Sequence, residues 1–206
     1  MCIRDSPTID HRGPEFSELA LKCLSGIKTI FKTKNPVIIF PGSGTGAWEA
    51  ALVNTLNDGD NVLMVETGHF ASLWNNMAQK LGLKVELLKT DWRQGLDPNE
   101  IEKRLRLDAD KKIKAVCIVH NETSTGCTSD VKAVREILDN LNHDALLMVD
   151  SISGLASMNY EHDEWGVDIT ISGSQKGLML PPGLSFNAIS EKAINASKKS
   201  GLKTVS

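Results

Sequence analysis

The sequence predicts an α/β fold: a mainly parallel sheet with helices on both faces. Short apolar strands alternate with amphipathic helices along most of the chain, which is typical of repeated strand–helix units. The strands are nearly continuous apolar runs, as at residues 37–40 and 145–149, and do not strictly alternate apolar with polar residues. Strands of this kind are buried on both faces of a parallel sheet.

The elements are predicted in order from spacing and from their end signals. Apolar residues three and four apart predict a helix over residues 15–31, which Asn35-Pro36 ends. Gly82 ends a later helix, and Asp130 caps another. Strands are predicted at residues 37–40, 61–65, 84–88, 114–119, 145–149 and, as the last one, 167–172; further helices are predicted at 47–56, 70–81, 99–107 and 131–140.

The composition excludes several classes of protein. The 206 residues are 41% hydrophobic and 24% charged, with a net charge of −3, which is ordinary for a globular protein. Because no stripe of Lys and Arg is present, we expect no nucleic-acid partner. No apolar run approaches the roughly 20 residues that span a bilayer, so we expect no membrane association and a cytoplasmic location. The four cysteines fit no zinc spacing, and we expect no metal.

Polar and glycine residues gather where the predicted strands end. They include the turn at residues 41–46, the segments 68–70 and 120–126, Asp150 and Lys176. Open parallel sheets bind ligands just beyond the carboxyl ends of their strands. We therefore expect these residues to form one shared site.

The glycine turn is suited to holding a phosphate. Gly42-Ser43-Gly44-Thr45 joins a strand to a helix, so backbone N–H groups and the positive end of a helix dipole are available there. The turn lacks the Gly-Lys-Ser/Thr ending of a nucleotide-triphosphate loop. It also fits Gly-x-Gly-x-x-Ala, and Glu66 ends the next strand, so an NAD-binding domain stays open as an alternative.

Asp150 and Lys176 together favour pyridoxal phosphate (PLP). A carboxylate after a buried strand is costly unless it meets a cation, and the protonated pyridine nitrogen of PLP is one. A partly desolvated lysine has a lowered pKa and can attack an aldehyde. Each residue alone has an ordinary explanation, as a helix cap or a surface lysine. Beside a phosphate turn they indicate PLP, because an NAD site needs neither.

Other polar and aromatic residues near these loops have structural interpretations. A histidine at a strand end, such as His120, is more often a hydrogen-bonded structural residue than a base. Trp48, Trp74, Trp92 and Trp165 are interpreted as packing residues and not as ligand contacts.

The motifs resemble those of the class V aminotransferases, and within them those of the serine–glyoxylate and alanine–glyoxylate enzymes. Ser-Gly-Ser-Gln-Lys at 172–176 with Pro-Pro-Gly at 181–183 is the specific pair. Pro-Gly-Ser-Gly-Thr at 41–45, His-Asn-Glu-Thr-Ser-Thr-Gly at 120–126 and Val-Asp-Ser at 149–151 agree with it. The resemblance runs from about Pro7 to the end of the chain.

The resemblance implies a fold type I PLP enzyme that forms a homodimer. Lys176 would be the catalytic residue, holding PLP as a Schiff base and moving the α proton. The other implied cofactor contacts are Asp150 at the pyridine nitrogen, Ser43, Gly44, Thr45 and Gln175 at the phosphate, Thr123 at the phenolic oxygen, and Phe70 and Ile152 on the two ring faces.

The implied reaction moves an amino group from a small L-amino acid, serine or alanine, to glyoxylate, giving glycine and a 2-keto acid. Phe70 and Thr45 stand where alanine–glyoxylate enzymes have tryptophan and histidine, which favours the serine-using branch. The alternatives are a class V enzyme with another amine donor, a desulfurase-like lyase, the NAD-binding domain, and a fragment that binds cofactor without activity.

The resemblance also implies an incomplete chain, because family members are nearly twice as long. We expect residues 1–6 to be a non-native start, 7–35 an N-terminal helical segment, and 36–206 a truncated PLP-binding large domain. The small C-terminal domain, with the arginine that binds the substrate carboxylate, would follow Ser206. The chain alone is therefore expected to be inactive.

Overall fold

The computed structural model describes residues 9–201 and contains one mixed sheet. Residues 1–6, which were predicted to be a non-native start, lie outside this range. The strands are β1 (Val37–Gly42), β2 (Asn61–Glu66), β3 (Lys84–Lys89), β4 (Ile113–Val119), β5 (Leu146–Asp150), β6 (Ile169–Gly173) and β7 (Gly183–Ile189). The helices are α1 (Pro14–Phe31), α2 (Gly44–Thr55), α3 (His69–Lys80), α4 (Pro98–Leu107), α5 (Val131–Asn140) and α6 (Glu191–Ser197).

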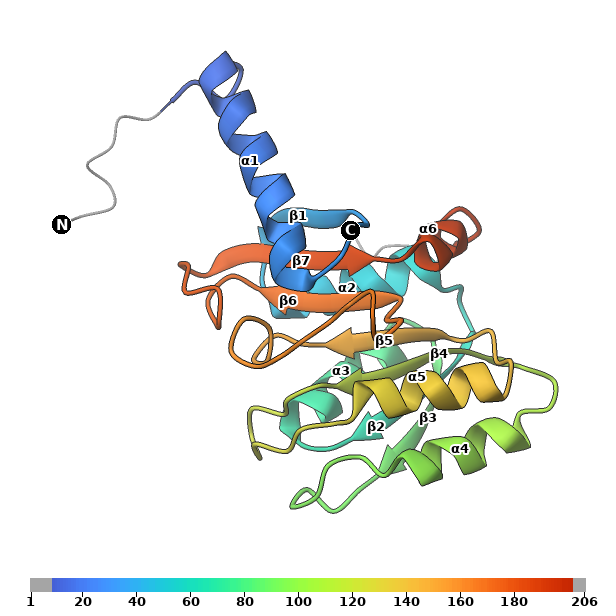
Figure 1. Cartoon of the computed structure of the whole chain (residues 1–206). Coiled ribbons are helices and arrows are strands. Elements are labelled where there is room, and N and C mark those ends of the chain that lie inside the picture. Colours follow the sequence, from blue (N-terminus) through green and yellow to red (C-terminus); the bar gives the residue numbers. More distant parts are fainter. Residues whose placement is uncertain (1–8, 202–206) are drawn as a thin grey trace.

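The sheet has seven strands in the order β1-β7-β6-β5-β4-β2-β3 (Figure 1). All neighbouring pairs among β6, β5, β4, β2 and β3 are parallel. The predicted α/β class and the mainly parallel sheet are thus confirmed.

The prediction that the strand near residues 167–172 is the last one is wrong. β7 follows it and pairs antiparallel with both β6 and β1. The physical reason is the short connection between β6 and β7, residues 174–182. Parallel strands need a crossover of a dozen or more residues, so a shorter link returns the chain in the opposite direction.

Helices cover both faces of the sheet. On one face α2, α3 and α6 pack over a core that includes Leu52, Trp74 and Met148. On the other face α4, α5 and the end of α1 pack over a second core that includes Phe31, Val116 and Leu147. Both predicted helical layers are therefore present.

Most of α1 extends away from the sheet (Figure 1). Only Ile27 and Phe31, near its carboxyl end, are buried. Exposed apolar side chains line the rest of it: Phe16, Leu19, Leu21, Leu24 and Ile30. Lys32, in the left-handed region with φ 52°, ends the helix.

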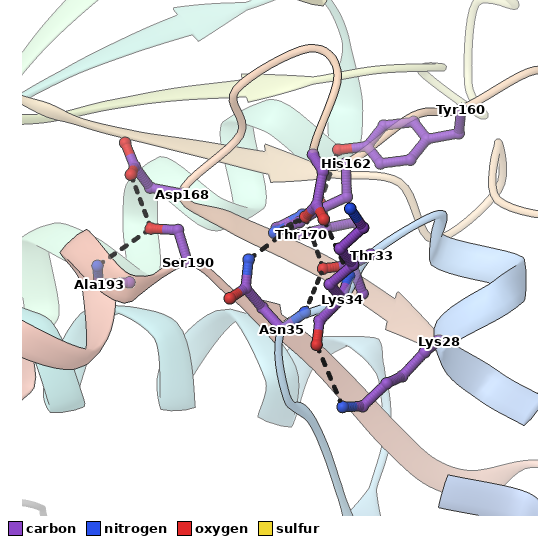
Figure 2. A network of polar contacts seen from close by, with 11 residues as sticks. Lys28, Thr33, Lys34, Asn35, Tyr160, His162, Asp168, Thr170, Ser190 and Ala193 are labelled. Carbon is purple, nitrogen blue, oxygen red and sulfur yellow. Dashed lines mark hydrogen bonds and ion pairs between the residues drawn. The ribbon is translucent and has the colours of Figure 1, made fainter. Parts of the chain in front are cut away.

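A polar network fixes the end of α1 to the sheet (Figure 2). Asp163 accepts hydrogen bonds from the Thr33 hydroxyl at 2.6 Å and from the backbone N–H of Lys34 at 2.8 Å. Its neighbour His162 is fully buried, and His162 Nδ1 lies 2.6 Å from the hydroxyl of Thr170 on β6. These contacts hold β6, which leads directly to Lys176, against the segment after α1.

The described residues show neither a membrane span nor a metal cluster. Across residues 9–201, every helix is too short or too polar to cross a bilayer. In the same range, no group of three or more His, Cys, Asp or Glu side chains is arranged to hold a metal ion.

Candidate functional site

The residues predicted from the sequence gather around one cavity of about 180 Å³. The lining consists of Ser43, Gly44, Thr45, Trp48, Phe70, Val119, Asn121, Thr123, Asp150, Ile152, Ser153, Gln175 and Lys176. Every sequence-predicted site residue is among them. The structure thus brings all of these residues together, while the role of each toward a cofactor remains a prediction.

Strand register explains why residues distant in sequence meet here. In the parallel pairs, Val119 of β4 lies opposite Asp150 of β5, and Asp150 lies opposite Ile171 of β6. The loops that follow these strands therefore leave the sheet at the same edge. At the antiparallel pairs, Gly42 lies opposite Gly183 of β7, which places the glycine turn at that edge as well.

The glycine turn is held in place from β7. The hydroxyl of Ser185, a fully buried residue, donates to the backbone oxygen of Ser43 at 2.6 Å. A Cβ on Gly42 would lie 2.5 Å from the Ser185 Oγ, and a Cβ on Gly44 would collide with Ile152 Cδ1. Ser43 makes no side-chain capping bond to α2. Because Ser43, Gly44 and Thr45 line the cavity, the amino end of α2, with its positive dipole, lies at the cavity wall.

Asp150 is a buried carboxylate without a cation. Its side chain accepts hydrogen bonds from Trp48 Nε1 at 2.9 Å and from the backbone N–H of Ile152 at 2.8 Å. The pKa of Asp150 is raised to about 7: burial is the main cause, the two hydrogen bonds lower the pKa, and the charge of Glu122 adds a smaller rise. Within residues 9–201, no basic side chain forms an ion pair with it. Such a group favours a cation entering the cavity.

Trp48 corrects the interpretation of the tryptophans as packing residues alone. It stacks on Trp74 with ring centroids 5.9 Å apart, but it also lines the cavity and donates to Asp150. Trp48 lies four residues after Gly44, which places it on the same face of α2 as the glycine turn. The four-residue spacing between Gly44 and Trp48 was therefore a signal in the sequence that Trp48 lies near the site.

Asn121 and Ser153 are further cavity residues that the sequence did not single out. The side-chain amide of Asn121 donates to Ser153 Oγ at 3.0 Å, and the Ser153 hydroxyl donates to the Asn121 backbone oxygen at 2.7 Å. This pair joins the loop after β4, which carries Thr123, to the loop after β5, which carries Ile152. Phe70 reaches the same cavity from the first turn of α3.

The loop that carries Lys176 is closed by Ser174. The fully buried Ser174 donates from its hydroxyl to the backbone oxygen of Pro181 at 2.7 Å and accepts from the N–H of Leu184 at 3.3 Å. A Cβ on Gly177 would collide with the backbone oxygen of Leu155. These contacts explain why the serine–lysine motif and the proline–glycine motif occur together: they are the two sides of one hairpin.

His120 lies outside the cavity. It is buried, and its ring packs against Tyr160 and Trp165 at centroid distances of 5.1 and 5.8 Å. Burial lowers the pKa of His120, so its ring is neutral at physiological pH. This packing agrees with a structural role, but the expected hydrogen bond is not found at Nδ1, which is buried without a partner among the described residues.

A larger cavity of about 430 Å³ lies among β1, β7, α2 and α6. Its lining is mainly apolar, from Ile38 and Phe40 to Ile194, and contains no ionisable residue. Size alone would select this cavity, but of the two it is the smaller one that contains ionisable side chains, Asp150 and Lys176, beside the glycine turn. We therefore place the functional site at the smaller cavity.

The sequence profile described as aminotransferase class-V matches residues 5–203. The chain belongs to this family. The serine–glyoxylate aminotransferase of Methylorubrum extorquens is 47% identical over 190 residues, covering 92% of this chain and 47% of the relative. The L-aspartate–glyoxylate aminotransferase of Paracoccus denitrificans is 47% identical over 193 residues, covering 93% of this chain and 49% of the relative. The chain thus spans about half the length of these curated relatives.

A solved aminotransferase structure has the same fold as this chain. The alanine–glyoxylate aminotransferase of Nostoc sp. superposes with a TM-score of 0.89 at 30% identity. The match covers 98% of this chain and 52% of the Nostoc chain. The predicted fold type I architecture is therefore confirmed for the part of the chain that the structure describes.

Strand order argues against the NAD-binding alternative for this class-V chain. In a dinucleotide-binding fold, the strand before the glycine turn lies next to the strand whose terminal acid binds the ribose. Here β7, β6, β5 and β4 lie between β1 and β2, the strand that Glu66 ends. Glu66 is consequently far from the glycine turn and does not line the cavity.

Proposed function

We propose that the chain is the PLP-binding part of a glyoxylate aminotransferase. The observation that carries the proposal is Asp150, a buried carboxylate without a cation, in one cavity with Lys176 and the glycine turn. Asp150 suits a cation, Lys176 an aldehyde and the glycine turn a phosphate, and PLP contains all three groups. The relatives' names support the choice of reaction.

Each residue would contribute a distinct part of the chemistry. When bound, PLP supplies an electron sink for the negative charge that develops at the substrate's α carbon. Lys176 would hold the aldehyde carbon and then carry the α proton. Asp150, held by Trp48 and the Ile152 amide, would keep the pyridine nitrogen protonated.

The remaining lining residues would position the cofactor. Ser43, Gly44, Thr45 and Gln175 would bind the phosphate at the amino end of α2. Phe70 and Ile152 would contact the two ring faces. Thr123 would lie at the phenolic oxygen, on the loop that the Asn121–Ser153 pair holds.

The substrates we propose are glyoxylate and a small L-amino acid, serine or alanine. The aspartate-named relative makes aspartate the donor to compare with them. The full-length protein from the same gene, loaded with PLP, would be assayed for glycine formed from glyoxylate with each donor. Glycine formed with serine or alanine supports the proposal. Activity with aspartate alone would change the donor, and no glycine with any donor would overturn the reaction.

We also propose a homodimer and a cytoplasmic location. The exposed apolar side chains of α1 support a partner surface, because contiguous apolar patches are uncommon on monomers. The free thiols of Cys23, Cys117 and Cys127 suit a reducing compartment.

Phe70→Ala is expected to weaken PLP binding, because the pyridine ring of PLP would lose the aromatic side chain that contacts one of its two faces. A favourable aromatic pair contributes about 0.5–1.5 kcal/mol beyond burial, which corresponds to a roughly two- to tenfold rise in Kd. Absorbance titration of the chain with PLP measures this change. Leu73→Ala removes an exposed apolar side chain from the same helix and serves as the control. Equal affinities for both variants would show that Phe70 is only a packing residue.

A further inference from the structure

We propose that Glu122 is a positioning residue that sets the place of Phe70 by capping α3 from a different loop. This inference rests on the proposed function, since it concerns the same cavity. Glu122 follows β4 and is fully buried, yet it does not line the cavity. A buried carboxylate so close to the site needs partners that offset its desolvation.

Those partners are backbone N–H groups at the start of α3. Oε2 of Glu122 lies 3.1 Å from the N–H nitrogen of Ala71, and Oε1 lies 3.4 Å from that of Phe70. Oε1 also accepts from the hydroxyl of Ser124 at 2.7 Å and from its backbone N–H at 3.0 Å. The same Ser124 oxygen accepts from the N–H of His69 at 3.0 Å. Three successive donors of the first turn therefore end on one carboxylate and one hydroxyl.

Gly68 makes this capping from outside the helix possible. It occupies the N-cap position of α3 and supplies no capping side chain. A Cβ at Gly68 would lie 2.6 Å from both Cδ of Glu122 and Oγ of Ser124. With φ 167° the backbone of Gly68 is extended, so a glycine is required here by space and not by backbone strain. The space beside Gly68 is filled by the Glu122 carboxylate.

The negative charge of Glu122 matters as well as its shape. The first turn of a helix carries a partial positive charge, which favours a carboxylate there. Hydrogen bonds to an ionised acceptor are roughly twice as strong as neutral ones. A glutamine at position 122 would have one acceptor oxygen and would turn its NH₂ group toward one of the N–H donors.

Capping by Glu122 links two parts of the cavity wall. Phe70 lines the cavity and belongs to the capped turn, while Thr123 lines it and directly follows Glu122. The carboxylate therefore fixes the α3 side of the cavity relative to the loop after β4. Without it, the first turn of α3 has no comparable acceptor, and Phe70 is expected to lose its fixed place.

Glu122→Gln tests this in the chain itself, with Glu136→Gln, an exposed residue of α5, as the matched control. Without cofactor, amide hydrogen exchange at residues 69–71 should become about tenfold faster or more, while the core strands stay protected. With PLP added, the Kd should rise roughly two- to tenfold, and the visible circular dichroism of the bound cofactor should change. The control should match the wild type in all three measurements.

The outcomes separate this inference from the proposed function. Unchanged exchange at residues 69–71, or an equal increase throughout the sheet, would overturn the capping role. Faster local exchange with unchanged PLP affinity and dichroism would overturn the positioning role. A wild-type chain that binds no PLP contradicts the proposed function instead, and the exchange data still decide the capping role.

Ser124→Ala provides a second test if Glu122→Gln does not fold. Ser124 is exposed, so its truncation should be tolerated. It removes the acceptor of the His69 N–H and one donor to Glu122. Faster exchange at residue 69 supports the capping network, and unchanged exchange there contradicts it.

Discussion

Lys176→Ala is expected to abolish covalent attachment of PLP and to lower transamination by the full-length protein by about 10²–10⁴-fold. The rate effect corresponds to the loss of a general acid–base group. Lys176 lies at the cavity, in the hairpin that Ser174 closes. For the chain alone, borohydride reduction in the presence of PLP followed by peptide mapping should find the cofactor on Lys176 in the wild type and nowhere in the variant.

Lys132→Ala is the control for this experiment, because Lys132 is an exposed lysine of α5 that does not line the cavity. After borohydride reduction the Lys132→Ala variant should carry the cofactor on Lys176, and it should have wild-type activity. Cofactor found mainly on another lysine, in the wild type or in Lys132→Ala, would contradict the assignment of Lys176. An active Lys176→Ala protein would contradict it as well.

The order of strands and helices up to β6 could be predicted from the sequence, because apolar periodicity and end signals are local. β7 was missed because its place in the sheet depends on two features that are not local. One is the short hairpin after Gly173, which pairs β7 with β6, and the other is its pairing with β1, far away in the sequence. Such long-range pairing leaves little trace in a single segment. The Pro-Pro-Gly motif before β7 indicated a loop but not the direction of the chain after it.

The site was predictable where a residue's chemistry is unusual for its position. Asp150 and Lys176 stand at strand ends, and the cavity contains both. Trp48 and Glu122 were missed as contributors because their roles depend on partners in other loops. The indole of Trp48 is bonded to Asp150, and the carboxylate of Glu122 to the first turn of α3. Neither partner is close to its counterpart in the sequence.

Asp150→Asn is expected to stabilise the cofactor-free chain at pH 8 and to remove part of its pH dependence. Burial raises the folded-state pKa of Asp150 from 3.8 to about 7. Between these values the folded protein holds a proton that the unfolded chain has released, so the free energy of unfolding falls as pH rises. Above pH 7 the loss is on the order of 4 kcal/mol, by about 1.4 kcal/mol per pKa unit.

Asparagine cannot ionise, so the variant should lack this slope. It gives up about 1 kcal/mol, because its NH₂ group faces either Trp48 Nε1 or the Ile152 amide. Urea unfolding at pH 5 and pH 8 measures the difference. Asp144→Asn, at an exposed aspartate, is the control and should keep the wild-type slope. A wild-type slope in Asp150→Asn would show that another group titrates.

The same substitution is expected to weaken PLP binding strongly, although it stabilises the empty protein. With PLP bound, the protonated pyridine nitrogen would pair with the Asp150 carboxylate and keep it ionised at neutral pH. Removing one member of a buried, hydrogen-bonded charge pair costs about 2–5 kcal/mol, which is a rise in Kd of roughly thirtyfold or more. Titration of both proteins with PLP at pH 8 measures this rise. Unchanged affinity together with the predicted loss of pH slope would show that Asp150 is buried and titrates, but that its carboxylate does not meet the pyridine nitrogen.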